Sequence, residues 1–151
     1  MSAFIIIIVK KGDFMKVTIS TIHKEEAWEL RHKVMWPEKH FDFIKLADDD
    51  LGIHHGVFKD KALVSVISLF VSNNKAQFRK FATLPKEQGK GYGSALLQHV
   101  LEEVSSLGLK KLWCNARMNK TDFYQKFGLH ETGESFKKED KVYVIMEREI
   151  K

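Results

Sequence analysis

Three consecutive apolar segments in the middle of the chain are rich in the β-branched and aromatic residues that strands favour, and short polar runs separate them. The segments are "LGIHHGVFK", "ALVSVISLFVS" and "AQFRKFATL", joined by the short polar runs "DK" and "NNK". Segments of this composition predict β-strands, and such short connections favour antiparallel hairpins. A shorter strand is predicted over residues 17–22, where Val17, Ile19 and Thr21 alternate with their neighbours.

Two other segments have apolar residues at helical spacing. In "KEEAWELRHKVM", Ala27, Leu30 and Val34 share one face, and Pro37 follows, which predicts a helix that ends before the proline. A second helix is predicted after the glycine-rich run near residue 90, and Gly108 is expected to end it in a left-handed cap. The apolar stripe of this helix consists of Leu96, Leu97, Val100, Leu101, Val104 and Leu107.

The order of the remaining segments predicts the fold class. "KKLWCNAR" is a strand, "NKTDFYQKFGL" is a short helix closed by Gly128, and "HETGESF" and "KVYVIMERE" are a final strand pair. A strand, a crossover helix and a second strand form a right-handed unit, so residues 77–83 and 110–115 should be parallel neighbours. The prediction is one mixed α/β domain, with a largely antiparallel sheet and one parallel βαβ crossover.

The first fourteen residues have two interpretations. The apolar run in "MSAFIIIIVKKGDF" is too short to span a membrane or to serve as a signal sequence. Residues 1–14 are either an upstream extension, with translation starting at Met15, or an extra edge strand over residues 5–9. The domain proper is therefore expected to comprise residues 15–151.

Composition excludes several classes of protein. The 151 residues fit one domain, and a single cysteine rules out an internal disulfide framework. No cysteine or histidine spacing suggests a metal site, so no metal is expected. The net charge of +5 comes from scattered residues rather than basic runs, so we expect neither nucleic acid nor membrane as a partner. The cytoplasm is the expected compartment.

Three of the nine glycines, Gly89, Gly91 and Gly93, stand at alternate positions between a predicted strand and a predicted helix. A helix N-terminus exposes backbone N–H groups that attract phosphate, and glycine lets the backbone curl around an anion. Lys86 and Lys90 add positive charge. The run fits neither the Walker motif nor the dinucleotide fingerprint, and it predicts a different kind of phosphate-binding loop.

The run Gln88-x-x-Gly91-x-Gly93 resembles the pyrophosphate loop of the GNAT superfamily of acyl-CoA-dependent N-acetyltransferases. "FYQKFGL", residues 123–129, is similar to a later motif of that family, and the predicted element order also resembles its fold. The resemblance covers about residues 17–149. It implies a GNAT-like domain that uses acetyl-CoA as co-substrate.

The resemblance also implies roles for individual residues. Pantetheine would run along the strand before the loop, and Tyr124 would be the general acid that protonates the departing thiolate. The family often has a carboxylate on that strand, but "AQFRKFATL" has none. The implied cofactor-binding residues are Phe81, Ala82, Thr83, Gln88, Gly89, Lys90, Gly91, Tyr92, Gly93, Ser94 and Asn119.

The general base has weaker candidates. His54 or His55 could act through a water molecule, and strand alternation points one to each face; the alternative is a surface histidine or one satisfied in the core. Residues 48–50, three aspartates, could attract a cationic amine or form a solvated loop. Cys114 could carry an acyl group, but a small buried hydrophobe is the favoured interpretation.

The expected function is transfer of an acetyl group from acetyl-CoA directly to a primary amine on a small molecule or a peptide. The acceptor is expected to enter near the first helix and the connector "PEKHFDFIKLADDD" that follows it. The alternative function is a non-catalytic acyl-CoA-binding regulatory module. The exposed edge of the final strand pair is a candidate contact for a homodimer.

Overall fold

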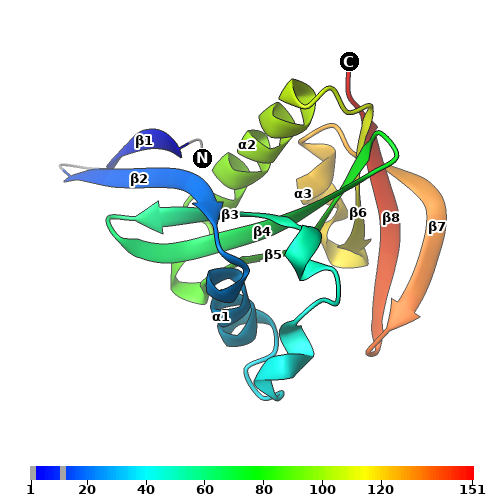
Figure 1. Cartoon of the computed structure of the whole chain (residues 1–151), viewed down its shortest axis with the longest axis horizontal. Coiled ribbons are helices and arrows are strands. Elements are labelled where there is room, and N and C mark those ends of the chain that lie inside the picture. Colours follow the sequence, from blue (N-terminus) through cyan, green and yellow to red (C-terminus); the bar gives the residue numbers. More distant parts are fainter. Residues whose placement is uncertain (1–2, 11–12) are drawn as a thin grey trace. The chain divides into compact units, whose positions relative to one another are not determined.

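The computed structural model describes residues 3–10 and 13–151, and the side chains from residue 16 onward. Two compact units can be distinguished. The first comprises the residues up to Leu69 together with Lys80–His99, and the second comprises Phe70–Arg79 together with Val100–Lys151. Strands β4 (Ala62–Ser72) and β5 (Lys75–Thr83) and helix α2 (Tyr92–Ser106) continue from one unit into the other, so both belong to a single α/β domain (Figure 1).

The strands of the first unit form antiparallel pairs in chain order, as the short connections predict. Strand β2 pairs with β1 on one side and with β3 on the other, and β3 pairs with β4. Residues 5–9 lie within β1; whether translation starts at Met1 or Met15 stays a prediction. The bounds of these strands are β1 Ala3–Lys10, β2 Asp13–Ile22 and β3 Ile53–Lys59.

Helix α1 (Lys24–Met35) has the predicted bounds and packs through its apolar face. Its Leu30 forms a buried cluster with Val66 of β4 and Ala82 of β5. The predicted connector contains two 3-10 turns, η1 (Phe41–Ile44) and η2 (Asp49–Leu51), which follow α1 in the first unit (Figure 1). The helix therefore lies against the end of β5 that leads into the glycine loop.

The second unit contains the parallel pair predicted from the crossover. Lys75, Ala76 and Gln77 of β5 pair with the first three residues of β6 (Lys111–Arg117), and the sheet is therefore mixed. Strand β8 (Lys141–Glu149) pairs antiparallel with β6 and with β7 (His130–Lys138). All residues of β7, the last strand of the sheet, are exposed, and the homodimer contact expected at this edge stays a prediction.

Beyond the parallel pair, β5 contains a left-handed residue that the sequence did not suggest. Lys80 has φ +56° although it is not a glycine. A residue in this conformation inside a strand produces a local kink and changes the direction of the strand. The kink comes one residue before Phe81, at the start of the segment expected to hold pantetheine.

The predicted stripe of α2 is correct except at its end. Leu96, Leu97, Val100, Leu101 and Val104 are buried, but Leu107 is 48% exposed. The helix ends at Ser106, and Gly108 has φ +73° with its N–H bonded to the Ser105 carbonyl at 3.0 Å. Leu109, whose N–H bonds to Val104 at 3.2 Å, is buried in place of Leu107. Such a contact commonly accompanies a glycine cap.

Candidate active site

The glycine loop connects a 3-10 turn, η3 (Pro85–Glu87), to the start of α2. Gly89 has φ +76° and Gly91 has φ +93°, a conformation that side chains disfavour. A Cβ atom added at either glycine would meet nothing within 4 Å. Both glycines are therefore needed for their backbone conformation, and the space beside them is open to a ligand.

Gly93 has a different role. Its φ is not in the left-handed region, but an added Cβ would lie 3.3 Å from Cζ of Phe81 and 3.6 Å from Oγ1 of Thr83. The glycine therefore allows the first turn of α2 to approach the end of β5 closely. Two of the three glycines shape the loop, and the third seats the helix on the strand.

The loop presents the N-terminus of α2 to solvent. The Ala95 N–H donates to the Gly91 carbonyl at 3.0 Å, so the N–H groups of Tyr92, Gly93 and Ser94 precede the first helical hydrogen bond. Such N–H groups carry a partial positive charge and bind anions. Ser94 is exposed, whereas the Tyr92 side chain is buried. Of Tyr92, only the backbone can contact a ligand at the surface.

Hydrogen bonds fix the flanks of the loop. Gln88 Nε2 donates to the Thr83 carbonyl at 3.1 Å, which ties the loop to β5. Lys59 Nζ donates to Glu87 Oε1 at 3.1 Å, and Lys90 Nζ lies 3.5 Å from Glu87 Oε2. Burial alone would raise the pKa of Glu87, but the hydrogen bond and charge of Lys59, with the charge of Lys90, lower it. Lys90 is thus held beside the loop by an ionised carboxylate.

The strand segment expected to hold pantetheine is firmly placed. Ala82 is buried, and its carbonyl accepts a hydrogen bond from Ser65 Oγ at 3.1 Å. The Ser65 hydroxyl also lies 2.8 Å from Oγ1 of Thr83. Phe81 is half-buried and contacts the start of α2 beside Gly93. This segment and the glycine loop lie in the same unit, and Thr83 and Phe81 contact Gln88 and the start of α2.

Tyr124 and Cys114 lie in the second unit. Tyr124 is on α3 (Thr121–Gln125), with its ring centroid 5.6 Å from that of Phe78. Burial, and to a smaller extent the neighbouring Cys114, raise the pKa of Tyr124, so its hydroxyl is protonated at neutral pH. Burial also raises the pKa of Cys114 to about 12, and its side chain is 2% exposed. Cys114 is a buried hydrophobe, as the sequence favoured. Asn119 is exposed on η4 (Met118–Lys120).

The two candidate base residues are both buried. His54 Nδ1 lies 2.7 Å from Ser68 Oγ, and its Nε2 lies 2.9 Å from the Asp49 carbonyl. His55 is fully buried, with its ring centroid 5.0 Å from that of His99 on α2. The two histidines point to opposite faces, as alternation predicted, but both faces are covered. The contacts of His54 are those of a histidine satisfied in the core.

A buried ion pair that the sequence patterns do not indicate lies next to His54. Arg31 of α1 donates from Nη1 to Asp49 Oδ2 at 2.8 Å and from Nη2 to Oδ1 at 2.9 Å. Asp49 also accepts from Trp28 Nε1 at 2.7 Å and from the Leu46 N–H at 2.8 Å. Burial alone would raise the pKa of Asp49, but these hydrogen bonds and the Arg31 charge lower it to about 2. Asp49 is therefore neither solvated nor available to a substrate amine.

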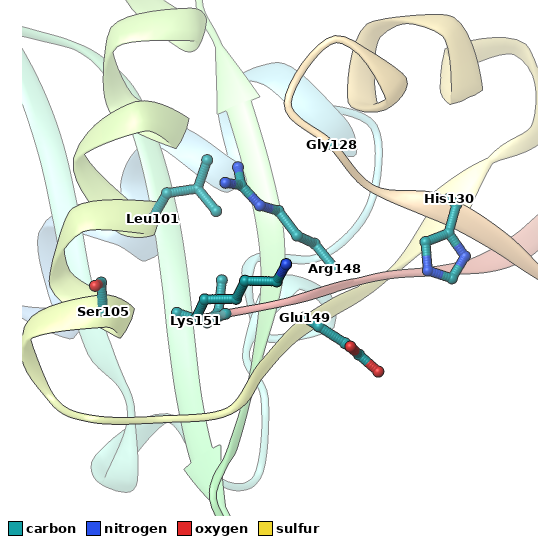
Figure 2. Close-up of a pocket in the computed structure, with 8 residues that line it drawn as sticks. Leu101, Ser105, Gly128, His130, Arg148, Glu149 and Lys151 are labelled. Atoms are coloured by element: carbon teal, nitrogen blue, oxygen red, sulfur yellow. The ribbon is translucent and has the colours of Figure 1, made fainter.

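A surface pocket of about 530 Å³ lies in the second unit (Figure 2). Figure 2 shows the Arg148 side chain extending from β8 toward Leu101 of α2, while Glu149 points away from it. Arg148 Nη1 donates to the Phe127 carbonyl at 2.8 Å, so its guanidinium binds the turn that follows α3. The pocket contains none of the catalytic or cofactor-binding residues predicted from the sequence. It is lined by Leu101, Ser105, Gly128, His130, Arg148, Glu149, Ile150 and Lys151.

No group of three or more histidine, cysteine, aspartate or glutamate residues that could hold a metal ion occurs within residues 3–10 and 13–151. In the same described ranges, no helix has both the length and the apolar character needed to cross a membrane.

Comparison with solved structures shows the fold. A putative N-acetyltransferase from Lactobacillus plantarum superposes with a TM-score of 0.79 at 19% identity, over 91% of this chain and 99% of that one. A GNAT family acetyltransferase from Elizabethkingia anophelis, solved with acetyl-CoA bound, gives 0.70 at 17% identity, over 89% and 98% of the two chains. These proteins share the architecture described above.

Comparison of sequences shows the family. Residues 19–150 match the model of the acetyltransferase (GNAT) domain. The chain is also 31% identical over 127 residues to the uncharacterised N-acetyltransferase YitI of Bacillus subtilis, covering 78% of this chain and 85% of that protein. Together with the glycine loop and the mixed sheet, these matches show that the chain is an acyltransferase of the GNAT superfamily of N-acetyltransferases.

Proposed function

We propose that this enzyme transfers an acetyl group from acetyl-CoA to a primary amine. The glycine loop is the observation that carries the proposal: two left-handed glycines with open space beside them lead directly into an exposed helix N-terminus. This arrangement suits a diphosphate, and a structural neighbour was solved with acetyl-CoA bound. The cofactor-binding groups would be the backbone of residues 89–94, with Lys90, Gln88 and residues 81–83, and Asn119 would lie near pantetheine.

The transfer requires a neutral amine and a proton for the leaving sulfur. The amine nitrogen attacks the thioester carbonyl carbon, the C–S bond breaks, and the sulfur takes a proton as the nitrogen loses one. Tyr124 would supply the proton to sulfur, since its hydroxyl is protonated at neutral pH. A lysine-like amine is mostly charged at pH 7, and keeping it neutral costs roughly 4.6 kcal/mol. With His54 and His55 buried, we propose that the amine proton is lost to water.

Calorimetric titration with coenzyme A tests the loop. We expect Gly91→Ala to weaken binding about tenfold or more, because alanine disfavours φ +93° and places a methyl group where the ligand approaches. Gly133→Ala is the matched control: Gly133 has φ +95°, and an added Cβ there also meets nothing within 4 Å. It lies on exposed β7 and should leave binding unchanged. No binding of coenzyme A to the unmodified protein would overturn the proposal.

Steady-state release of CoA tests the acid. Tyr124→Phe should lower kcat by about 10²–10⁴-fold without weakening coenzyme A binding. The control Tyr143→Phe, in the same unit, should leave kcat unchanged. Undiminished turnover would exclude the acid role. If water accepts the amine proton, kcat/KM should keep rising between pH 6 and 9. A base such as His55, whose pKa is lowered to about 4, would already be neutral and would give a flat profile over this range.

A further inference from the structure

Four aromatic rings gather on α1 and the connector after it, and we call them the aromatic surface. They are Trp28 and Trp36, with Phe41 and Phe43 of η1. Phe41 is 37% exposed and Phe43 is 42% exposed, and the Trp36 and Phe43 rings meet edge to face at 5.3 Å. Large exposed aromatic side chains grouped in one place commonly mark a binding surface.

Primary ammonium groups of the chain itself already lie on these rings. Lys39 Nζ lies 5.2 Å from the Phe43 centroid and 6.0 Å from the Trp36 centroid. Lys45 Nζ lies 4.6 Å from the Trp28 centroid and 5.5 Å from that of Phe41. An ammonium group within about 6 Å of a ring centroid is attracted by the electrons of the ring. The surface therefore has the geometry that binds an alkylammonium ion.

The charge of this segment favours a cation as well. Residues 24–50 contain eight acidic and five basic side chains, a net charge of −3 in a chain whose net charge is +5. Asp42 lies 2.9 Å from Lys45 Nζ, and Asp50 is paired with Lys24. These two carboxylates thus stand beside Lys45 and Lys24, whose ammonium groups lie over the Trp28 ring. Carboxylates next to aromatic rings suit cationic amines and disfavour anions.

The aromatic surface lies on α1 and on the connector directly after it, and α1 packs on the proposed pantetheine strand. Leu30 of α1 lies in one buried cluster with Ala82 of β5, and Val34 and Met35 of α1 pack against that cluster. His32 Nε2 lies 2.8 Å from the Lys39 carbonyl, which joins the connector to the helix. A ligand on the aromatic surface would therefore lie on a connector that is joined to the helix packed against Ala82.

We propose that the acceptor is a diamine or polyamine with primary amino groups. One ammonium group would displace Lys39 from the Phe43 and Trp36 rings, and a second amino group would be acetylated. This inference rests on the proposed acetyl transfer and deepens it by naming the class of substrate. The exposed side chain of Lys39 can swing into solvent when the substrate ammonium takes its place.

The test is a calorimetric titration of the full chain saturated with coenzyme A. The probe is 1,5-diaminopentane, and 1,5-pentanediol, which has the same length without charge, is its control. We expect the diamine to bind and the diol not to bind. Equal binding of both would mean that the surface makes apolar contacts only, and it would overturn the proposal.

Three variants locate the bound ammonium. Phe43→Leu should weaken diamine binding by about three- to fivefold, because a ring face is lost at an exposed position. Lys39→Met should strengthen binding by a similar factor, because a competing ammonium group is removed. Lys33→Met is the matched control. Lys33 pairs with Glu29 on α1, so this substitution removes one positive charge from the same segment but not from the rings. Equal effects of the two lysine variants, or no effect of Phe43→Leu, would contradict the proposed position.

The outcomes separate this inference from the proposed function. If coenzyme A itself does not bind, the acetyl-transfer proposal falls. If coenzyme A binds and a monoamine such as 1-aminopentane releases CoA as fast as the diamine does, the enzyme is an acetyltransferase and only the diamine inference falls.

Discussion

Two polar clusters lie on opposite faces of β3 and differ in how their polar atoms are satisfied. On the face toward η2, Arg31, Asp49, Ser68 and His54 form a network in which Asp49 alone accepts four hydrogen bonds. On the face toward α2, His55 has no hydrogen-bond partner at either ring nitrogen among the residues that the structure describes. One face of β3 thus covers the charged Arg31–Asp49 pair, which has its hydrogen-bond partners. The other face carries the neutral His55, which has none among the described residues.

The difference shows what each cluster requires to be buried. Arg31 is fully buried, and of its nitrogens only Nε lacks a partner in the described part of the chain. A buried charge of this kind is tolerated only when its counter-ion and hydrogen bonds are present. His55 instead remains uncharged: burial, together with the neighbouring His99 and His54, lowers its pKa to about 4. The first cluster depends on ionisation, and the second depends on neutrality.

The largest expected effect comes from breaking the ion pair. Asp49→Asn should lower the free energy of unfolding by about 3–5 kcal/mol, because Arg31 stays buried without its counter-ion. Urea unfolding followed by tryptophan fluorescence measures this. The control is Asp50→Asn, which removes an exposed carboxylate paired with Lys24 and should cost less than about 1 kcal/mol. Similar losses in both variants would show that the buried pair has no special importance.

As the pH falls, the two clusters should lose their contributions to the free energy of unfolding in different pH ranges. The pKa of His55 is lower in the folded state, about 4 against an ordinary 6.5, so its contribution is present above pH 6.5 and is lost as the pH falls to 4. This loss should reach up to about 3 kcal/mol. Asp49, with its pKa lowered from 3.8 to about 2, should lose its contribution only below pH 4.

Unfolding curves of the unmodified protein and of His55→Leu across this range measure the effect. In the leucine variant, the free energy of unfolding should no longer fall between pH 6.5 and 4. It should still fall below pH 4, where Asp49 becomes protonated. A variant that retains the full dependence would mean that another group titrates in that window.

A smaller effect is expected from Ser68, which links Arg31 to His54. Its hydroxyl lies 2.8 Å from Arg31 Nη2 and 2.7 Å from His54 Nδ1. Ser68→Ala should cost about 2 kcal/mol, since a charged donor and a ring nitrogen each lose a buried partner. Ser65→Ala on the same strand is the comparison, because its hydroxyl contacts only uncharged groups on β5. An equal or larger loss at Ser65 would argue against a linking role for Ser68.

The smallest expected effect has the opposite sign. At pH 8, His55→Leu should raise the free energy of unfolding by about 1 kcal/mol, because an apolar side chain of similar size replaces a buried polar group without partners. Thermal unfolding at pH 8 measures the change. A loss of stability would show that a buried water satisfies the ring and that the two clusters are more alike than the hydrogen bonds indicate.

Local patterns predicted most of the fold. The period of hydrophobic residues, with Pro37 after it, predicted the bounds of α1. The short connections predicted that β3, β4 and β5 follow one another in the sheet. The crossover rule gave the parallel pair of β5 and β6. The predicted burial of Leu107 was wrong because a helical period does not show at which residue a helix ends. The chain turns at the Gly108 cap, and Leu109 is buried instead.

The site was predictable only where conformation depends on local sequence. Gly89 and Gly91 are left-handed, as a curled loop requires, but the role of Gly93 depends on Phe81, a residue twelve positions earlier in the chain. The pairing of Arg31 with Asp49 could not be inferred, since nothing in a run of three aspartates shows which one turns inward. Distant contacts of this kind also buried both candidate histidines.

The burial of Cys114 has a practical consequence for every experiment on this enzyme. The chain has one sulfhydryl, which is 2% exposed, with a pKa of about 12. Colorimetric disulfide reagents react with thiolates, so they should leave the folded protein unlabelled and report only the thiol that turnover liberates. The same shielding should let the purified protein be kept in air without reductant and without covalent dimers.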